Sequence, residues 1–287
     1  MRIPTHWVRG EYSGQDQEGQ PRKFWAWGWS FGDLAEATAM AAQRARRIFE
    51  HFVQGGTPCT YDYLEHPLRE EIVQSYGHGE STSAVITRNR YGSLVLNSAK
   101  VCFVDVDFPT AEPLGLFGSL KALFMAKKIR EQAAAAQAET MQRVRQWATR
   151  NPRRSFRLYR TAAGLRMLLT DRLYDPNSAE VATMFEELGS DALYRKLTQK
   201  QECFRARLTP KPWRCDCRRP PNRYPWENPK YENTYRKWQQ GYESKMKDYG
   251  TCHFLEAFGA EASDETIGGV IEVHDKTACC GPEVKLA

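Results

Sequence analysis

One helix-forming stretch set between short apolar runs constrains the fold of this chain most strongly. Residues 117 to about 150 are rich in Ala, Gln and Lys, which favours a single long helix. Short β-type runs precede it at 84–89, 93–97 and 101–109, and two more follow at 155–161 and 165–170. The first three runs, separated by little sequence, predict an antiparallel meander, and the last two predict a hairpin turning at Ala162-Ala-Gly. Strands on both sides of a long helix predict an α+β fold.

The opening segment alternates polar and aromatic residues from His6 to Trp29. This period of two is typical of a strand, with Trp25, Trp27 and Trp29 on one face. We expect that face to turn toward the core, although tryptophans in a row are also able to stack on bases or a sugar.

Helical spacing and capping residues predict the remaining elements. A helix should begin after Ser30 or Asp33 and run to about Phe52, and the alternation from Gly269 to Asp275 predicts a final strand. Further helices are expected at 64–75, 178–188, 191–200 and 231–249.

The length of 287 residues allows one elaborated domain. We expect an α+β core over residues 1–200. Residues 205–229 are dense in Arg, Lys, Pro, Trp and Cys, which is typical of irregular loops. The sequence therefore predicts that residues 201–287 form an irregular Cys-, Pro- and Arg-rich extension packed on the core.

Apolar content and cysteine usage bear on the compartment. No window approaches the roughly 18 to 20 apolar residues that cross a bilayer, and the first residues lack the apolar stretch of a signal peptide. The eight cysteines are irregularly spaced, which favours reduced thiols or a metal site over disulfides. We therefore expect a cytoplasmic protein with no membrane partner.

The net charge of +6 is unevenly distributed. Six arginines lie between Arg153 and Arg172 against one acid, and ten Lys or Arg residues lie between Arg195 and Arg223 against two acids. Such clusters attract polyanions, so a nucleoside triphosphate and a nucleic acid, DNA or RNA, are the expected partners. The alternative is a solvated basic face.

The sharpest chemical feature is Val104-Asp105-Val106-Asp107 at the end of an apolar strand. Alternation puts both carboxylates on one face. Mg²⁺ or Mn²⁺ is held by one or two carboxylates together with substrate phosphates. Asp105 and Asp107 are therefore the predicted metal ligands and catalytic residues, unless they belong to the polar face of a surface strand.

Arginines around the predicted hairpin and the later basic strand supply candidate phosphate ligands, because the guanidinium fork matches phosphate oxygens. Glycine at the turn allows close approach of a ligand. Taken singly, these arginines are also suited to pairing with Asp171, Glu186 or Glu187. The predicted nucleotide- and phosphate-binding residues are Arg157, Arg160, Thr161, Gly164, Arg166, Arg205, Arg207 and Lys211.

Three thiols accompany the basic strand, at Cys203, Cys215 and Cys217. Together with Cys252-His253 or Cys279-Cys280 they offer ligands for a tetrahedral Zn²⁺. Cys-x-Cys differs from the usual spacing of a zinc knuckle, so zinc enters as a secondary expectation.

In the order of these motifs the chain resembles the catalytic core of the archaeo-eukaryotic primase (primase-polymerase) superfamily. Phe103-Val-Asp-Val-Asp is similar to the metal motif of that family, and Tyr159-Arg-Thr-Ala-Ala-Gly-Leu-Arg resembles its nucleotide-binding hairpin. The resemblance covers roughly residues 83–215. It implies an RRM-like, mainly antiparallel sheet with flanking helices.

The resemblance also implies a metal-dependent nucleotidyltransferase acting on a nucleoside triphosphate and nucleic acid. Arg166 stands where the family has a histidine, and His274 is a substitute if the last element lies beside the site. Asp171, Glu272 and Asp275 are candidates for a third carboxylate. The alternatives are a non-catalytic nucleic-acid-binding protein, a metal-dependent nuclease or phosphohydrolase, and a structural ion network.

Overall fold

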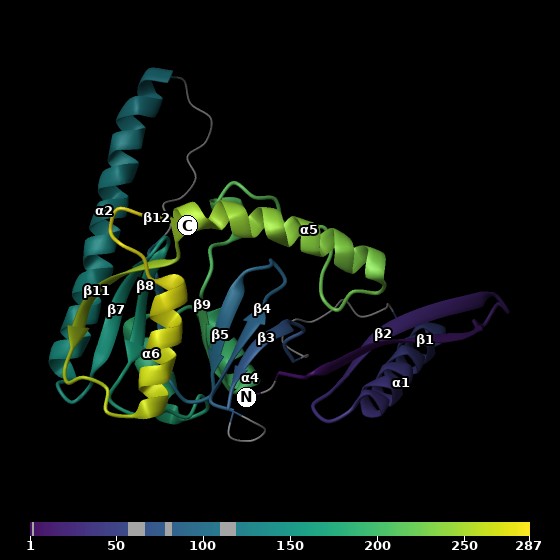
Figure 1. Cartoon of the computed structure of the whole chain (residues 1–287). Helices are drawn as coiled ribbons and strands as arrows, with labels where there is room; N and C mark the ends of the chain where they lie inside the picture. Colours follow the sequence, from purple (N-terminus) through teal and green to yellow (C-terminus); the bar gives the residue numbers. More distant parts are fainter. Residues whose placement is uncertain (2, 57–66, 78–81, 110–118) are drawn as a thin grey trace.

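The computed structural model describes residues 1, 3–56, 67–77, 82–109 and 119–287. It is a mixture of helices and mainly antiparallel strands, which confirms the predicted α+β class (Figure 1). Among the described residues, no helix is long and apolar enough to cross a membrane.

Two four-stranded antiparallel sheets form the body of the molecule. Residues after 200 contribute one strand to each sheet. The first sheet has the order β11 (Cys252–Phe258), β7 (Phe156–Thr161), β8 (Gly164–Leu169), β6 (Phe103–Asp107). The second has the order β3 (Glu71–Tyr76), β4 (Ala84–Arg88), β5 (Leu94–Ser98), β9 (Phe204–Arg207).

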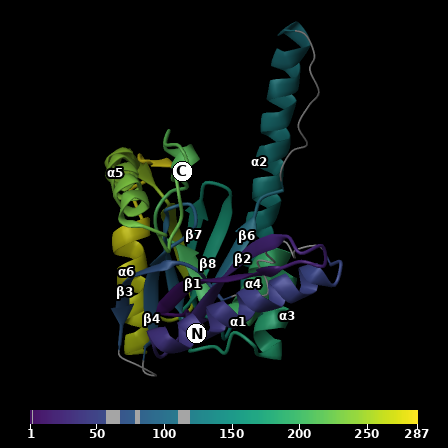
Figure 2. The same ribbon diagram turned by 90° about the vertical axis from the view of Figure 1, so that its right-hand side faces the viewer.

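Helices cover both sides of the sheets (Figure 2). On one side α6 (Glu265–Ala278) buries Ile267 and Val270 in the main core. The helices of the other side are α2 (Ser119–Arg150), α3 (Ala179–Leu188) and α4 (Ala192–Gln201). There Trp147, from α2, packs its ring 6.0 Å from that of Phe156 on β7.

Helix α5 (Pro229–Lys245) crosses one end of the sheets (Figure 1). Its buried Tyr242 donates a hydrogen bond to the Pro210 carbonyl at 2.6 Å. Short 3₁₀ turns occupy Pro212–Arg214 and Met246–Asp248, and a small parallel pair joins β10 (Tyr249–Gly250) to β12 (Lys285–Leu286).

The N-terminal residues form a separate hairpin, β1 (His6–Gln15) and β2 (Pro21–Ser30), backed by α1 (Leu34–Val53). Small residues allow α1 to approach the strands closely. A Cβ on Gly28 would lie 2.3 Å from the Ala37 oxygen, and Ala37 and Ala41 are fully buried. The expectation that the tryptophans face the core is therefore wrong, because the small residues of β2 take the side toward α1.

Capping residues confirm several predicted helices. Asp33 accepts a hydrogen bond from the Glu36 amide at the start of α1, Ser178 from Val181 at α3, and Asp191 from Tyr194 at α4. Each side chain satisfies an amide that has no partner within its own helix.

Three predicted elements are wrong. Residues 71–76 are the strand β3, because pairing with β4 satisfies their backbone; residues 57–66 lie outside the described residues. The meander stops after β5, since β6 pairs with β8 in the other sheet. The predicted final strand lies inside α6, where Asp264 caps the helix and helical spacing buries Ile267, Val270, His274 and Ala278.

Candidate functional site: a charged seam between two sheets

The predicted carboxylates and arginines meet where the edge strand of one sheet lies beside that of the other. On β6, Asp105 is directly opposite Arg166 of β8, and Arg166 is opposite Tyr159 of β7. Residues opposite one another across a sheet share a face. Asp105, Arg166 and Tyr159 therefore form one row on the face that α6 covers.

Asp105 and Arg166 form a two-pronged ion pair. The Arg166 Nε lies 2.8 Å from Asp105 Oδ1, and its Nη2 lies 3.1 Å from Oδ2. The Arg166 side chain is only 2 % exposed, and its Nη1 donates to the Arg207 carbonyl at 2.9 Å. Both oxygens of Asp105 are thus engaged, and a buried guanidinium has its required anion.

Helix α6 extends this network with a histidine and a further carboxylate. His274 Nε2 lies 3.4 Å from Arg166 Nη1, and His274 Nδ1 lies 2.9 Å from Asp275 Oδ1. Burial lowers the pKa of His274. A neutral ring accepting from Arg166 at Nε2 and donating to Asp275 at Nδ1 satisfies both contacts.

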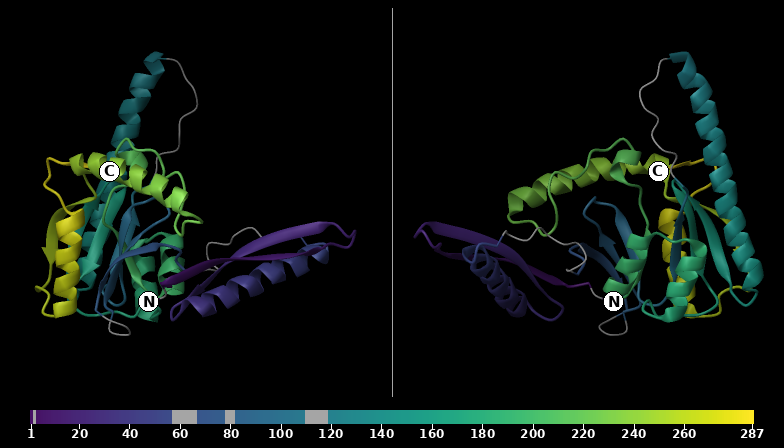
Figure 3. Two further views of the ribbon diagram at one scale, coloured as in Figure 1. Left: turned by 45° about the vertical axis from the view of Figure 1, so that its right-hand side comes forward. Right: turned by 180° about the vertical axis from the view of Figure 1, so that it is seen from behind.

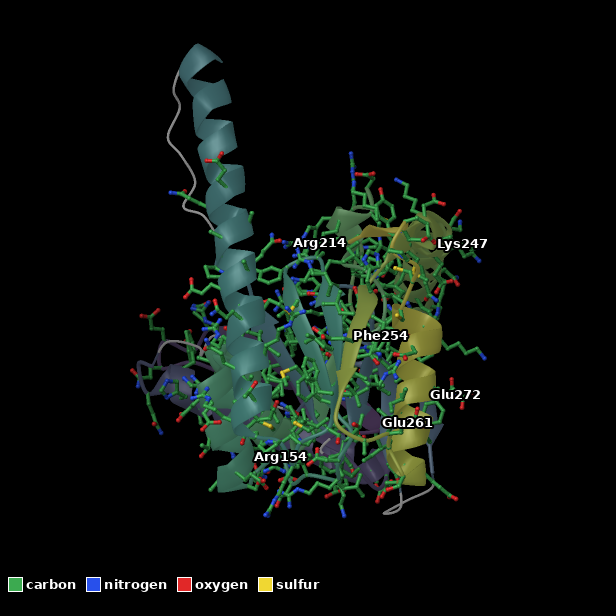
Figure 4. The ribbon with its side chains drawn as sticks, turned by 90° about the vertical axis from the view of Figure 1, so that its left-hand side faces the viewer. Arg154, Arg214, Lys247, Phe254, Glu261 and Glu272 are labelled. Carbon is green, nitrogen blue, oxygen red and sulfur yellow. The ribbon has the colours of Figure 1, made fainter. Side chains whose placement is uncertain are left out.

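Asp275, on α6, links the network to two residues of β7. Its Oδ2 accepts from Arg157 Nη2 at 2.9 Å, and Arg157 Nε donates to the Tyr159 hydroxyl at 2.8 Å. Of the three candidates for a third carboxylate, Asp275 is the one that joins this network. Asp171 instead pairs with Arg154, which lies at the opposite end of the sheets from Arg214 (Figure 4). Glu272 lines a separate cavity with β3 and β4.

Asp107 lies one step further along the same face of β6 and is exposed. Neighbouring atoms still remove part of the water around its carboxyl, and this desolvation, together with the charges of Asp105 and Asp191, raises its pKa. Opposite it, Gly164 allows the strands to approach, since a Cβ there would lie 2.2 Å from the Val106 oxygen. The predicted glycine thus serves strand packing beside the carboxylate.

Three cationic side chains lie near Asp107, at the end of the seam between β6 and β9. They are Arg207, at the end of β9, and Lys211 and Arg214, which follow it in the chain. Burial, and then the neighbouring guanidinium of Arg166, lowers the pKa of Arg207 to about 10. Burial, and then Arg207 and Arg214, lowers the pKa of Lys211. Within the described ranges, no carboxylate lies within ion-pair distance of these three side chains. We call Arg207, Lys211 and Arg214 the cationic mouth.

Two residues that were not predicted from the sequence, Tyr194 and Ser190, form hydrogen bonds where β6 lies beside β9. The Tyr194 hydroxyl lies 2.9 Å from the Phe103 oxygen of β6 and 3.2 Å from the Arg205 oxygen of β9. Ser190 donates to the Asp105 carbonyl at 3.0 Å. Tyr194 belongs to an ordinary amphipathic helix, so no sequence signal distinguishes it from a core residue.

Other predicted ligands have structural partners or lie elsewhere. Arg160 is on the opposite face of β7, where it stacks 4.1 Å from the Phe108 ring centroid. The Thr161 hydroxyl donates to the Gly164 carbonyl at 3.1 Å. Arg205 binds both carboxylate oxygens of the buried Glu70 at 2.9 Å.

The predicted thiols are reduced, and Cys203 and Cys215 are buried. Burial raises the pKa of each of these two thiols to about 11, which opposes the thiolate form that zinc binds. Over the ranges described, no three His, Cys, Asp or Glu side chains are grouped to hold a metal ion.

The fit to Mg²⁺ or Mn²⁺ is different with and without a phosphate ligand. Asp105 and Asp107 share a face, but Arg166 engages both oxygens of Asp105. A resident cation would therefore compete with Arg166 for its ligands. A cation arriving with a triphosphate brings phosphate oxygens as further ligands, and the two aspartates fit that case.

Comparison with known proteins found no relative of this chain. No family model matches the chain, and no curated protein or solved structure shows significant similarity to it. The resemblance to primase-polymerases therefore stays a prediction.

Proposed function

We propose that the cationic mouth binds the phosphates of a nucleoside triphosphate. The observation that carries this proposal is the state of Arg207, a partly buried guanidinium crowded by other cations and without a carboxylate partner among the described residues. Like charges held together at a protein surface gain most from a polyanion placed between them. Arginine is well suited to this role because its donors match phosphate oxygens.

The surroundings of the mouth favour a nucleotide over inorganic phosphate. Trp213 is 41 % exposed, and Lys211 Nζ lies 5.6 Å from the centroid of its ring. An exposed ring beside phosphate ligands offers a stacking surface for a base. Phosphate and base would then be recognised by neighbouring residues of one loop.

Replacing Arg207 by glutamine is expected to weaken binding of a nucleoside triphosphate roughly tenfold or more, because a hydrogen bond to a charged group contributes about 1.5–3 kcal/mol. Isothermal titration calorimetry without divalent cation measures this effect. Arg145→Gln is the matched control, since Arg145 is exposed on α2 and pairs with Glu256. Unchanged affinity in an Arg207→Gln, Lys211→Gln double variant would rule out the cationic mouth.

A second candidate function is metal-dependent nucleotidyl transfer of the primase-polymerase kind. It is favoured by Asp105 and Asp107, two carboxylates on one face beside the proposed phosphate ligands. These two residues would hold Mg²⁺ or Mn²⁺, which neutralises charge on a triphosphate during phosphoryl transfer. Arg166, which donates to both Asp105 oxygens, would hold that carboxylate in position.

Primer extension in Mn²⁺ tests this second function. Asp107→Asn is expected to lower the rate on the order of 100-fold, as loss of a metal ligand removes several kcal/mol of charge stabilisation. Glu186→Gln, with its exposed carboxylate on α3, is the control. If the wild-type protein binds triphosphate equally with and without Mn²⁺ and extends no primer, transfer is excluded and phosphate binding stands.

A further inference from the structure

On the N-terminal hairpin, a row of tryptophans lies on the face opposite the small residues that pack against α1. In the register of β1 and β2, Trp7 is opposite Trp29 and Arg9 is opposite Trp27. Trp25 is 49 % exposed, and the hairpin projects from one side of the two-sheet body (Figure 3). We call Trp7, Trp25, Trp27 and Trp29 the Trp face.

A cavity of about 550 Å³ lies over the Trp face. Its other walls come from Arg44 and Ile48 of α1 and from segments distant in sequence, including Leu68, Gln201 and Tyr224. This volume is in the range of cavities that hold small organic ligands. The ring nitrogen of Trp7 is buried and, among the described residues, has no hydrogen-bond acceptor, so a polar ligand atom would satisfy it.

The charge of this cavity selects the ligand. Among the described residues, five basic side chains line it: Lys23, Arg44, Arg69, Arg90 and Arg223. Glu70, the one acidic lining residue in the described part of the chain, already accepts from Arg205 and Thr87. Aromatic cages for cationic ligands are not built this way, because arginines repel a cation. The surface instead fits a ligand that combines negative charge with flat rings.

The rings are also held in position. The Arg9 guanidinium lies 4.7 Å from the Trp25 ring centroid, and that of Arg69 lies 5.1 Å from the Trp27 ring centroid. Arg9 is itself anchored to Glu227 at 2.6 Å. Rings fixed before binding reduce the entropy lost when a ligand is bound.

We propose that the Trp face binds single-stranded nucleic acid, with bases stacked on the tryptophans and phosphates near the lining arginines. Alternate residues of a strand repeat at about 7 Å, so the row extends over a length that a single nucleotide would not fill. Binding by stacking and phosphate contact tolerates any base sequence. This site lies on a different part of the chain from the cationic mouth and does not depend on it.

The test is fluorescence anisotropy with a labelled single-stranded oligonucleotide of roughly ten nucleotides, within the range of known site sizes. The Trp25→Ala, Trp27→Ala double variant is expected to bind at least about 30-fold more weakly, since each stacked base contributes about 1–3 kcal/mol. If the double variant does not fold, Trp25→Ala alone is expected to weaken binding at least about fivefold, because this ring is half-exposed and its loss should spare the fold.

The matched control is Phe31→Ala, an equally exposed aromatic (52 %) on the same part of the chain that does not line the cavity. Its affinity should stay within about twofold of wild type, as expected for a surface change. Unchanged affinity in the folded tryptophan variants overturns the proposal, as does equal binding of duplex or binding of a neutral oligosaccharide instead. Arg207→Gln separates the two sites: loss of oligonucleotide binding there, with none in the tryptophan variants, would support the cationic mouth and overturn the Trp face.

Discussion

Replacing Asp105 by alanine is expected to lower the free energy of unfolding by about 3–5 kcal/mol, because it leaves the Arg166 guanidinium buried without an anion. Arg166 is 2 % exposed, and the side-chain carboxylate that it binds is that of Asp105. Urea denaturation followed by circular dichroism measures the change. A loss of nucleotide binding in Asp105→Ala would therefore reflect loss of folding before loss of a ligand contact. Substitution of the exposed Asp107 is the better test of metal binding and catalysis.

A double variant separates the buried charge from the packing of the site. Asp105→Leu with Arg166→Met removes both charges and keeps apolar volume, so its stability should recover most of the loss, as seen when buried ion pairs are replaced together. If Asp105→Ala is within about 1 kcal/mol of wild type, water or rearrangement must compensate the guanidinium, and the buried pair is not the structural element described above.

The parts of the site that depend on local sequence could be predicted. Alternation alone placed Asp105 and Asp107 on one face, and the turn at Ala162-Ala-Gly joined β7 to β8 as expected. Which strand would pair with β6 is a long-range choice that no local pattern encodes. The partner β8 brings Arg166 into register with Asp105. Because of that register, Arg166, which was predicted to bind phosphate, is the buried counter-ion of Asp105.

The error at residues 269–275 has a specific cause. Val270, Glu272 and His274 alternate with other residues in a way that suits a strand, while Ile267, Val270, His274 and Ala278 also have helical spacing. Short apolar segments satisfy both periods, and the N-cap at Asp264 favours the helix. As a helix, this segment can lie across the sheet and bring His274 and Asp275 to Arg166 and Arg157, which a strand paired at an edge would not do.

The arginines of β9 illustrate how burial separates residues that look alike in sequence. Arg205 and Arg207 are two positions apart and carry the same side chain. Arg205 meets Glu70, which is 4 % exposed and also accepts from Thr87. Arg207 lies at the strand end, beside Lys211 and Arg214. One arginine is therefore committed to the fold, and the other is the one that we propose binds phosphate.

Arg205→Met is accordingly expected to destabilise the protein by about 3–5 kcal/mol, because the Glu70 carboxylate would stay buried and lose the cation that offsets its charge. Arg207→Met should change stability little or raise it, since it relieves repulsion among neighbouring cations. Thermal and urea unfolding of the two variants measure the contrast. If Arg205→Met keeps wild-type stability and loses triphosphate affinity, while Arg207→Met does the reverse, the roles assigned to these two residues are exchanged.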